Sequence, residues 1–185
     1  MLLNVHVGGQ WRHGETPEEK SRLISEVFGI LEEKGSGGPD WRPGEIAWFS
    51  FSEQPYGADS WPDNCLAVSV NASSGYGGLV WFFNGGKSGR KGGVYDRTWV
   101  SDNPAPPDFD PRVVSDPGHP LFHDPASTLP VAQVRRAVEE YGHNGTGDRP
   151  ECIGWIGGGM SGQRDDREPV IDTVEEPEID WDSIH

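Results

Sequence analysis

The sequence predicts an α+β fold, in which a largely antiparallel sheet of about five to seven strands packs against two helices within a single domain. Apolar residues recur at helical spacing in two segments, 16–35 and 128–145. Between these segments, residues 45–100 change to a period of two with short connections, which is typical of an antiparallel meander. The 185 residues suit one domain. We expect residues 1–157 to form it and residues 158–185 to form a glycine-rich linker and a flexible acidic tail.

The N-terminal part predicts a strand followed by a helix. The sequence "LLNVHV" at residues 2–7 alternates enough to form a strand, and two glycines end it. Thr16 then suits the N-cap of a helix, Pro17 its first position and Glu19 the capping-box position. Gly35 is a plausible stop. One apolar stripe at helical spacing predicts the face that packs on the core, and it consists of Leu23, Ile24, Val27, Phe28 and Leu31.

Four strands are predicted in the middle of the chain, because runs of β-branched and aromatic residues alternate with turn-forming residues there. These runs cover residues 45–51, 65–72, 77–84 and 95–101. The proline-rich segment 103–127 should be mostly irregular, since proline removes a backbone donor. Its exception is "RVVSD" at residues 112–116, which predicts a short edge strand.

A second helix is predicted to begin near Thr128 and to end at Gly142 or Gly145. Its apolar side consists of Leu129, Val131, Val134, Ala137, Val138 and Tyr141. The following "PECIGWIG" at residues 150–157 predicts a short buried strand, with Cys152, Ile153 and Trp155 facing the core.

The charge balance excludes some classes of partner. Asp and Glu number 30 against 15 Lys and Arg, and the formal net charge is −15. Such a field repels phosphate backbones, so we expect no direct binding of nucleic acid. It suits a basic partner, or simply high solubility. From Arg164 onward, nine carboxylates face two arginines, and such a segment cannot bury enough apolar surface to fold alone.

The location of the protein is predicted from the absence of two sequence signals, a secretory signal at the N-terminus and an apolar run long enough to span a membrane. The N-terminus has no basic region before a long apolar run, and no apolar run approaches the roughly 20 residues of a membrane span. We therefore expect a cytoplasmic protein without a membrane contact. One disulfide between Cys65 and Cys152, the two cysteines, is possible, but nothing in the sequence resembles a disulfide framework.

Motifs for enzyme chemistry are weak in this sequence. Gly86-Lys87-Ser88 resembles the end of a phosphate-binding loop, but Trp81 stands where that motif needs its first glycine. His119 and His123 lie among prolines that oppose a metal-binding helix, so we expect no metal and no cofactor. One enzymatic alternative stays open, a small hydrolase or transferase with Cys152 as the nucleophile and His119, His123 or His143 as the base. A buried structural role for Cys152 is the favoured interpretation.

The order of several short motifs resembles a known family. A segment containing Val114 and Asp116 precedes "LPV" at residues 129–131 and Ala137, and then "G-x-R-P" at residues 147–150 and Trp155. This order, together with "SGYGGLVWF" upstream and the opening strand and helix, resembles the first-numbered family of bacterial polymorphic-toxin immunity proteins over about residues 3–156. The glycine-rich "GGKSGRKGG" and the acidic tail depart from a minimal member.

The resemblance implies a cytoplasmic, non-enzymatic inhibitor that binds and neutralises a cognate toxin. Members of the family are often encoded beside deaminase-type toxins that act on nucleic acid. Such a toxin presents a basic cleft, which an acidic protein would reach rapidly and cover. An acidic interaction module unrelated to toxins is the alternative outside enzymes.

The residues expected to bind the partner combine carboxylates, which mimic phosphates, with exposed aromatic anchors. The group in the tail consists of Asp172, Glu175, Glu176, Glu178, Asp180, Trp181 and Asp182. The group in the loops consists of Trp41, Tyr56 and Trp61. For Trp181, the alternative is an idle residue of the tail.

Overall fold

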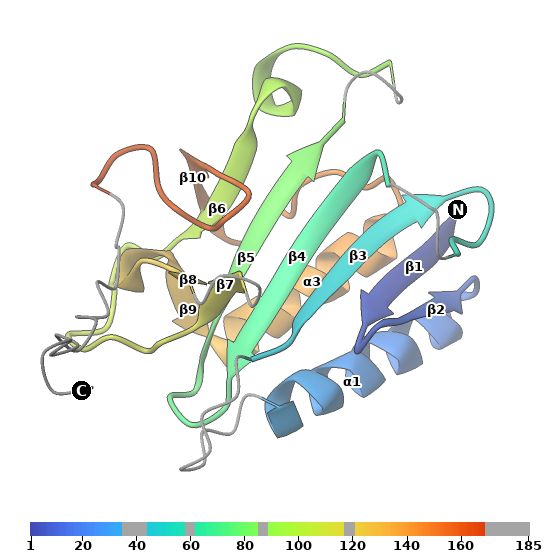
Figure 1. Ribbon diagram of the computed structural model, residues 1–185. Helices are drawn as coiled ribbons and strands as arrows, with labels where there is room; N and C mark the ends of the chain where they lie inside the picture. Colours follow the sequence, from blue (N-terminus) through green and yellow to red (C-terminus); the bar gives the residue numbers. More distant parts are fainter. Residues whose placement is uncertain (35–43, 58–61, 85–88, 117–120, 169–185) are drawn as a thin grey trace, which may run out of the picture.

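The computed structural model describes residues 1–34, 44–57, 62–84, 89–116 and 121–168 (Figure 1). The strands are β1 (Leu2–Val7), β2 (Gln10–Gly14), β3 (Ile46–Ser52), β4 (Asn64–Asn71), β5 (Tyr76–Phe83), β6 (Thr98–Asp102), β7 (Val114–Asp116), β8 (Leu121–Phe122), β9 (Thr128–Pro130) and β10 (Gly154–Gly158). The helices are α1 (Pro17–Lys34) and α3 (Val131–Asn144), with the short 3-10 helices η1 (Gly93–Asp96) and η2 (Pro125–Ser127).

The predicted α+β class with a largely antiparallel sheet and two packed helices is confirmed. An eight-stranded sheet has the order β10-β6-β5-β4-β3-β1-β2, with β9 paired to β5, and every pairing is antiparallel. The sheet is larger than predicted because β2 and β9 have no period-two apolar pattern. Both helices cover one face, as Figure 1 shows, and the small β7-β8 sheet lies on the other.

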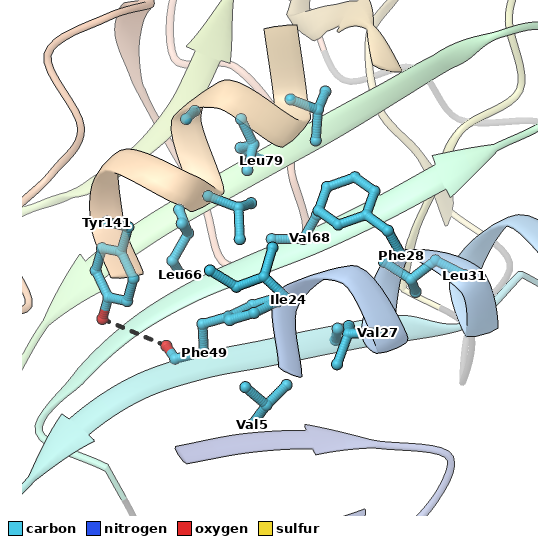
Figure 2. Close-up of a cluster of buried hydrophobic side chains, with 14 of the residues drawn as sticks. Val5, Ile24, Val27, Phe28, Leu31, Phe49, Leu66, Val68, Leu79 and Tyr141 are labelled. Atoms are coloured by element: carbon cyan, nitrogen blue, oxygen red, sulfur yellow. Dashed lines mark hydrogen bonds between the residues drawn. The ribbon is translucent and has the colours of Figure 1, made fainter. Parts of the chain in front are cut away.

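The main core lies between the sheet and the two helices. Figure 2 shows side chains of α1, such as Ile24 and Phe28, meeting strand residues such as Phe49 and Leu66, all of them fully buried. The hydroxyl group of Tyr141 on α3 donates a hydrogen bond of 2.8 Å to Asn64 Oδ1. The same amide oxygen accepts the N–H of Phe51 at 2.8 Å. The buried Tyr141 hydroxyl group and the Asn64 side chain are therefore paired, as burial requires.

The prediction for the first helix is confirmed in detail. The N–H of Glu19 donates to Thr16 Oγ1, and Glu19 Oε2 accepts the N–H of Thr16, both at 3.2 Å. These reciprocal bonds are a capping box, which satisfies donors that the first turn would leave unpaired. Hydrogen bonds from the backbone N–H groups of Glu15 and Thr16 lower the pKa of Glu19.

The second helix begins later than predicted. It starts at Val131 rather than near Thr128, because Thr128–Pro130 pairs with β5 as β9. Pro130 takes the N-cap position, where its missing N–H costs nothing. At the other end Gly145 adopts a left-handed conformation with φ 68° and caps the helix. Gly142, the other predicted stop, lies inside the helix and is buried.

The last strand differs from its prediction. β10 begins at Gly154, lies at the edge of the sheet beside β6 and is only half-buried along most of its length. Cys152 was expected to face inward from this strand, but it precedes β10 and is half-buried. An apolar composition does not distinguish an edge strand from a central one, so the burial was overestimated.

The described chain continues in regular contacts beyond residue 157, the expected end of the domain. Gly158 pairs with Arg164 in an isolated bridge, and the N–H of Asp165 donates to Gly157 O at 2.9 Å. Arg164, 8% exposed, forms ion pairs of 2.8 Å with Asp102 and Asp166. These contacts hold residues 158–166 against β6 and β10.

Candidate functional site

Of the residues predicted to bind a partner, Tyr56 lies in the described part of the chain. Trp41, Trp61 and the whole tail group fall outside it: Asp172, Glu175, Glu176, Glu178, Asp180, Trp181 and Asp182. Tyr56 is half-buried, and its ring packs edge-on against Trp11, with ring centroids 5.3 Å apart. The backbone N–H of Tyr56 donates to Asn4 Oδ1 at 3.0 Å. Burial, assisted by Asp63, raises the pKa of Tyr56.

The surroundings of Cys152 differ from those of a catalytic thiol. Burial and the neighbouring Glu140 raise the pKa of Cys152, whereas a nucleophile needs a lowered pKa. His123 is buried with its ring against Gly78 of β5, and His143 is exposed on α3. His119 lies outside the described ranges. Within those ranges, no group of three or more His, Cys, Asp or Glu residues is placed to hold a metal ion.

An arginine–tryptophan ladder lies at the β6-β10 edge of the sheet, and it consists of Arg97, Trp99, Arg149 and Trp155. The guanidinium carbon of Arg149 is 4.2 Å from the ring centroid of Trp99 and 5.7 Å from that of Trp155. Arg97 lies over the same Trp99 ring at 5.8 Å. Such cation–π contacts orient the planar guanidinium groups. Arginine and tryptophan are also the residues in which binding hot spots are enriched.

Residues 147–155 build the ladder through local constraints. Gly147 has φ +76°, and a Cβ there would meet Asn64 at 2.8 Å, so the position requires glycine. The indole N–H of Trp155 donates to Pro150 O at 2.7 Å, which closes the turn between them. The "G-x-R-P" motif and Trp155 thus belong to one turn. This turn places Arg149 close to two indole rings, those of Trp99 and Trp155.

The second helix clamps this turn from behind. Arg136 donates to Cys152 O at 2.9 Å, while Glu140 accepts the N–H groups of Glu151 and Cys152 at 2.7 and 3.1 Å. Burial opposes ionisation of Glu140, but hydrogen bonds from Cys152 and Glu151 lower its pKa overall. Cys152 therefore serves here as a backbone anchor between α3 and β10.

A hollow of about 470 Å³ opens beside the ladder between η1 and the turn. It is lined by Val94, Tyr95, Asp148, Arg149, Pro150, Glu151, Ile153 and Trp155. Asp148 is engaged by an ion pair with Arg90 and accepts the Tyr95 hydroxyl at 2.9 Å. By contrast, the buried Nη1 of Arg149 has no hydrogen-bond partner, and burial lowers the pKa of this guanidinium.

Sequence reasoning missed this ladder as a site. Pro150 and Trp155 were predicted to belong to a short buried strand and Arg149 entered only as part of a family motif, while Arg97 and Trp99 were not connected with them. Their spacing of two on a predicted strand places both on one face, and this was the available signal. The spacing could not reveal that the turn at residues 147–155 lies against the same face of the strand as Arg97 and Trp99.

Charge over the described surface remains acidic. The formal net charge of the chain is −15, and the segments outside the described ranges carry −6 of it, which leaves −9 on the described residues. Arg90, Lys91, Arg97 and Arg149 nevertheless gather around η1 and the ladder. Among the helices of the described chain, none has the length and hydropathy needed to cross a membrane.

Comparison with protein families gives a match over most of this chain. The family model of immunity protein Imm1 matches residues 9–156, a range that contains both helices, the whole ladder and all strands of the sheet except β1 and the end of β10. The search of curated proteins and the search of solved structures gave no match. Because the family match covers most of the sequence, this chain belongs to the Imm1 family of immunity proteins.

Proposed function

We propose that this chain binds a cognate polymorphic toxin in the cytoplasm and neutralises it without enzymatic chemistry of its own, by covering the basic active-site cleft of the toxin. The toxin is, in this proposal, a deaminase that acts on nucleic acid. The observation that carries the proposal is membership of the Imm1 immunity family over residues 9–156. An immunity protein implies a toxin as its partner.

The charge of the chain supports a basic partner surface. A toxin that acts on DNA or RNA neutralises phosphates with Lys and Arg around its active site. A protein with a net charge of −15 is attracted to such a cleft at long range, which accelerates association. Carboxylates then occupy positions that phosphates of the substrate would take, so that inhibitor and nucleic acid compete.

The residues proposed for this contact are those predicted from the sequence. The carboxylates Asp172, Glu175, Glu176, Glu178, Asp180 and Asp182 would mimic phosphates, and Trp181 would anchor them. Trp41, Tyr56 and Trp61 form the second proposed group. Aromatic anchors are needed because charges at the rim of an interface contribute mainly to association rate and specificity.

Co-expression tests the function directly. The chain is produced in a bacterial host together with the toxin domain encoded beside it, and growth and co-purification are measured. We expect rescue of growth and a stable complex. A host that stays inhibited, with no complex recovered, would contradict the proposal.

The chemistry of the toxin is tested separately. The purified toxin domain is incubated with single-stranded DNA and RNA, and deaminated bases are counted by sequencing with and without this chain. We expect deamination that disappears at one equivalent of inhibitor. An active toxin that leaves bases intact would retain the immunity function but exclude the deaminase assignment.

A further inference from the structure

We propose that the hollow beside the arginine–tryptophan ladder receives a carboxylate side chain, Asp or Glu, of the toxin. This inference rests on the proposed function. It adds a second contact in which the charges are reversed, with a cation of this chain and an anion of the toxin. The acidic surface would engage the basic cleft, while Arg149 would bind one acidic residue of the toxin outside that cleft.

The first argument is the state of Arg149. Its guanidinium plane is held against Trp99 at 4.2 Å and near Trp155 at 5.7 Å, and its buried Nη1 has no acceptor among the described residues. A buried donor without a partner is unusual in native proteins and calls for an explanation, and an acceptor supplied by a binding partner is the one proposed here. A guanidinium fixed by stacking is also prepared for binding, because little conformational freedom remains to be lost.

The second argument is the set of charges around the hollow. Asp148 is already engaged by Arg90 and by the hydroxyl group of Tyr95 at 2.9 Å. Of the lining residues, this leaves the cation of Arg149 and the exposed carboxylate of Glu151 to act on an incoming group. A planar carboxylate matches the paired N–H groups of arginine, whereas an incoming cation would be repelled by Arg149.

The third argument is the rigidity of the walls. Trp155, which lines the hollow, belongs to β10, and β10 is paired with its neighbour β6 in the sheet. The turn that carries Arg149 is clamped to α3 through Arg136 and Glu140. The hollow is thus formed before binding, and a volume of about 470 Å³ admits a single side chain.

Equilibrium binding to a catalytically inactive form of the adjacent toxin domain tests the proposal, with four variants compared to the wild type. We expect Arg149→Gln to weaken binding at least tenfold and Arg149→Lys to weaken it less, because lysine keeps the charge and loses the planar fork. Arg135→Gln is the matched control, since Arg135 also stacks on an aromatic ring, at 4.7 Å from that of Phe28, and forms a weak ion pair with Glu139 at 3.9 Å. It should bind as the wild type does.

The sign of the Glu151→Gln effect determines the charge of the occupant. Removing this exposed carboxylate should tighten binding about threefold if a carboxylate enters the hollow. Weaker binding of Glu151→Gln would overturn the proposal in favour of a cationic occupant, even if Arg149→Gln proved unable to fold. Folding of each variant is verified by thermal unfolding.

The remaining outcomes separate this inference from the proposed function. If the wild type binds and Arg149→Gln binds equally well, the hollow is not an anchor and only this inference fails. If the wild type does not bind the adjacent toxin domain, both fail together.

Discussion

The imidazole of His123 is enclosed between Gly78 of β5 and Gly162 of the C-terminal segment. A Cβ at Gly78 would lie 2.5 Å from His123 Cδ2, and one at Gly162 would lie 3.0 Å from the ring. Gly78 belongs to the "SGYGG" pattern on which the family resemblance partly rested. At this position the pattern is explained by packing, because only glycine leaves room for the ring.

This burial makes the stability of the protein dependent on the protonation of His123. Desolvation lowers its pKa from 6.5 to about 4, so the folded state holds the neutral ring while the unfolded chain binds a proton below pH 6.5. Stability is therefore lost as the pH falls from about 6.5 towards 4. Between pH 7 and pH 5 this group alone should remove about 2 kcal/mol of unfolding free energy.

Urea unfolding of the wild type and of His123→Gln at pH 7, 6 and 5 measures this contribution. Carboxylates also respond to acid, so the difference between the two pH profiles is the relevant quantity. The wild type should lose about 2 kcal/mol more than the variant over this range. Parallel profiles would show that His123 does not titrate in this window.

Local sequence signals were sufficient for α1 but not for the short strands. The capping box of Thr16 and Glu19 and the apolar stripe act within a few residues, so the helix was predicted almost to its boundaries. β9 contains Pro130 and has three residues, and its pairing with β5 depends on the tertiary fold. β10 was expected to be buried because its composition is apolar, although its position at the edge is set by the order of strands.

The capping box also gives a direct prediction. Thr16→Ala removes the acceptor of the Glu19 N–H and should lower the unfolding free energy by about 1 kcal/mol. Thr16→Ser keeps the hydroxyl group and serves as the control, which should remain within a few tenths of a kcal/mol of the wild type. Denaturant unfolding of both variants at neutral pH provides the measurement.

The segment 158–166 is attached to the sheet mainly through Arg164. Its guanidinium group donates at 2.8 Å to both Asp102 and Asp166 and at 3.1 Å to Ala126 O. The hydrogen bond to Asp166, followed by that to Asp102, raises the pKa of Arg164 against the effect of burial, so it stays charged throughout the accessible pH range. Replacing a buried, paired cation leaves its acceptors unsatisfied.

We therefore expect Arg164→Met to destabilise the protein by about 2 kcal/mol and to accelerate amide hydrogen exchange in β10 and residues 158–166. Arg167→Met is the matched control, because Arg167 is exposed and its contact with Asp124 is longer, at 3.4 Å. It should change stability by less than about 0.5 kcal/mol. Equal effects of the two variants would show that the ion pairs of Arg164 do not fix this segment.

Across the whole molecule, features of the sequence itself could be predicted, whereas contacts between residues far apart along the chain could not. Net charge and motif order are properties of the sequence itself, and the motif order led to the immunity family. The ladder joins Trp99 to Arg149, 4.2 Å apart in space and fifty residues apart in sequence. Contacts of this kind arise from topology, here from the return of the chain after α3 to the edge strand β6.

Association with the toxin should depend strongly on salt if the net charge guides it. Raising the salt from 50 to 300 mM should slow association by roughly tenfold or more while changing dissociation much less, because ions screen long-range attraction more than close contacts. A chain ending at residue 168 lacks six carboxylates and should show a smaller salt dependence. Stopped-flow kinetics of both chains with the inactive toxin domain give the two slopes. Identical slopes would mean that the carboxylates of residues 1–168 steer association and that Trp181 and its acidic neighbours contribute nothing to it.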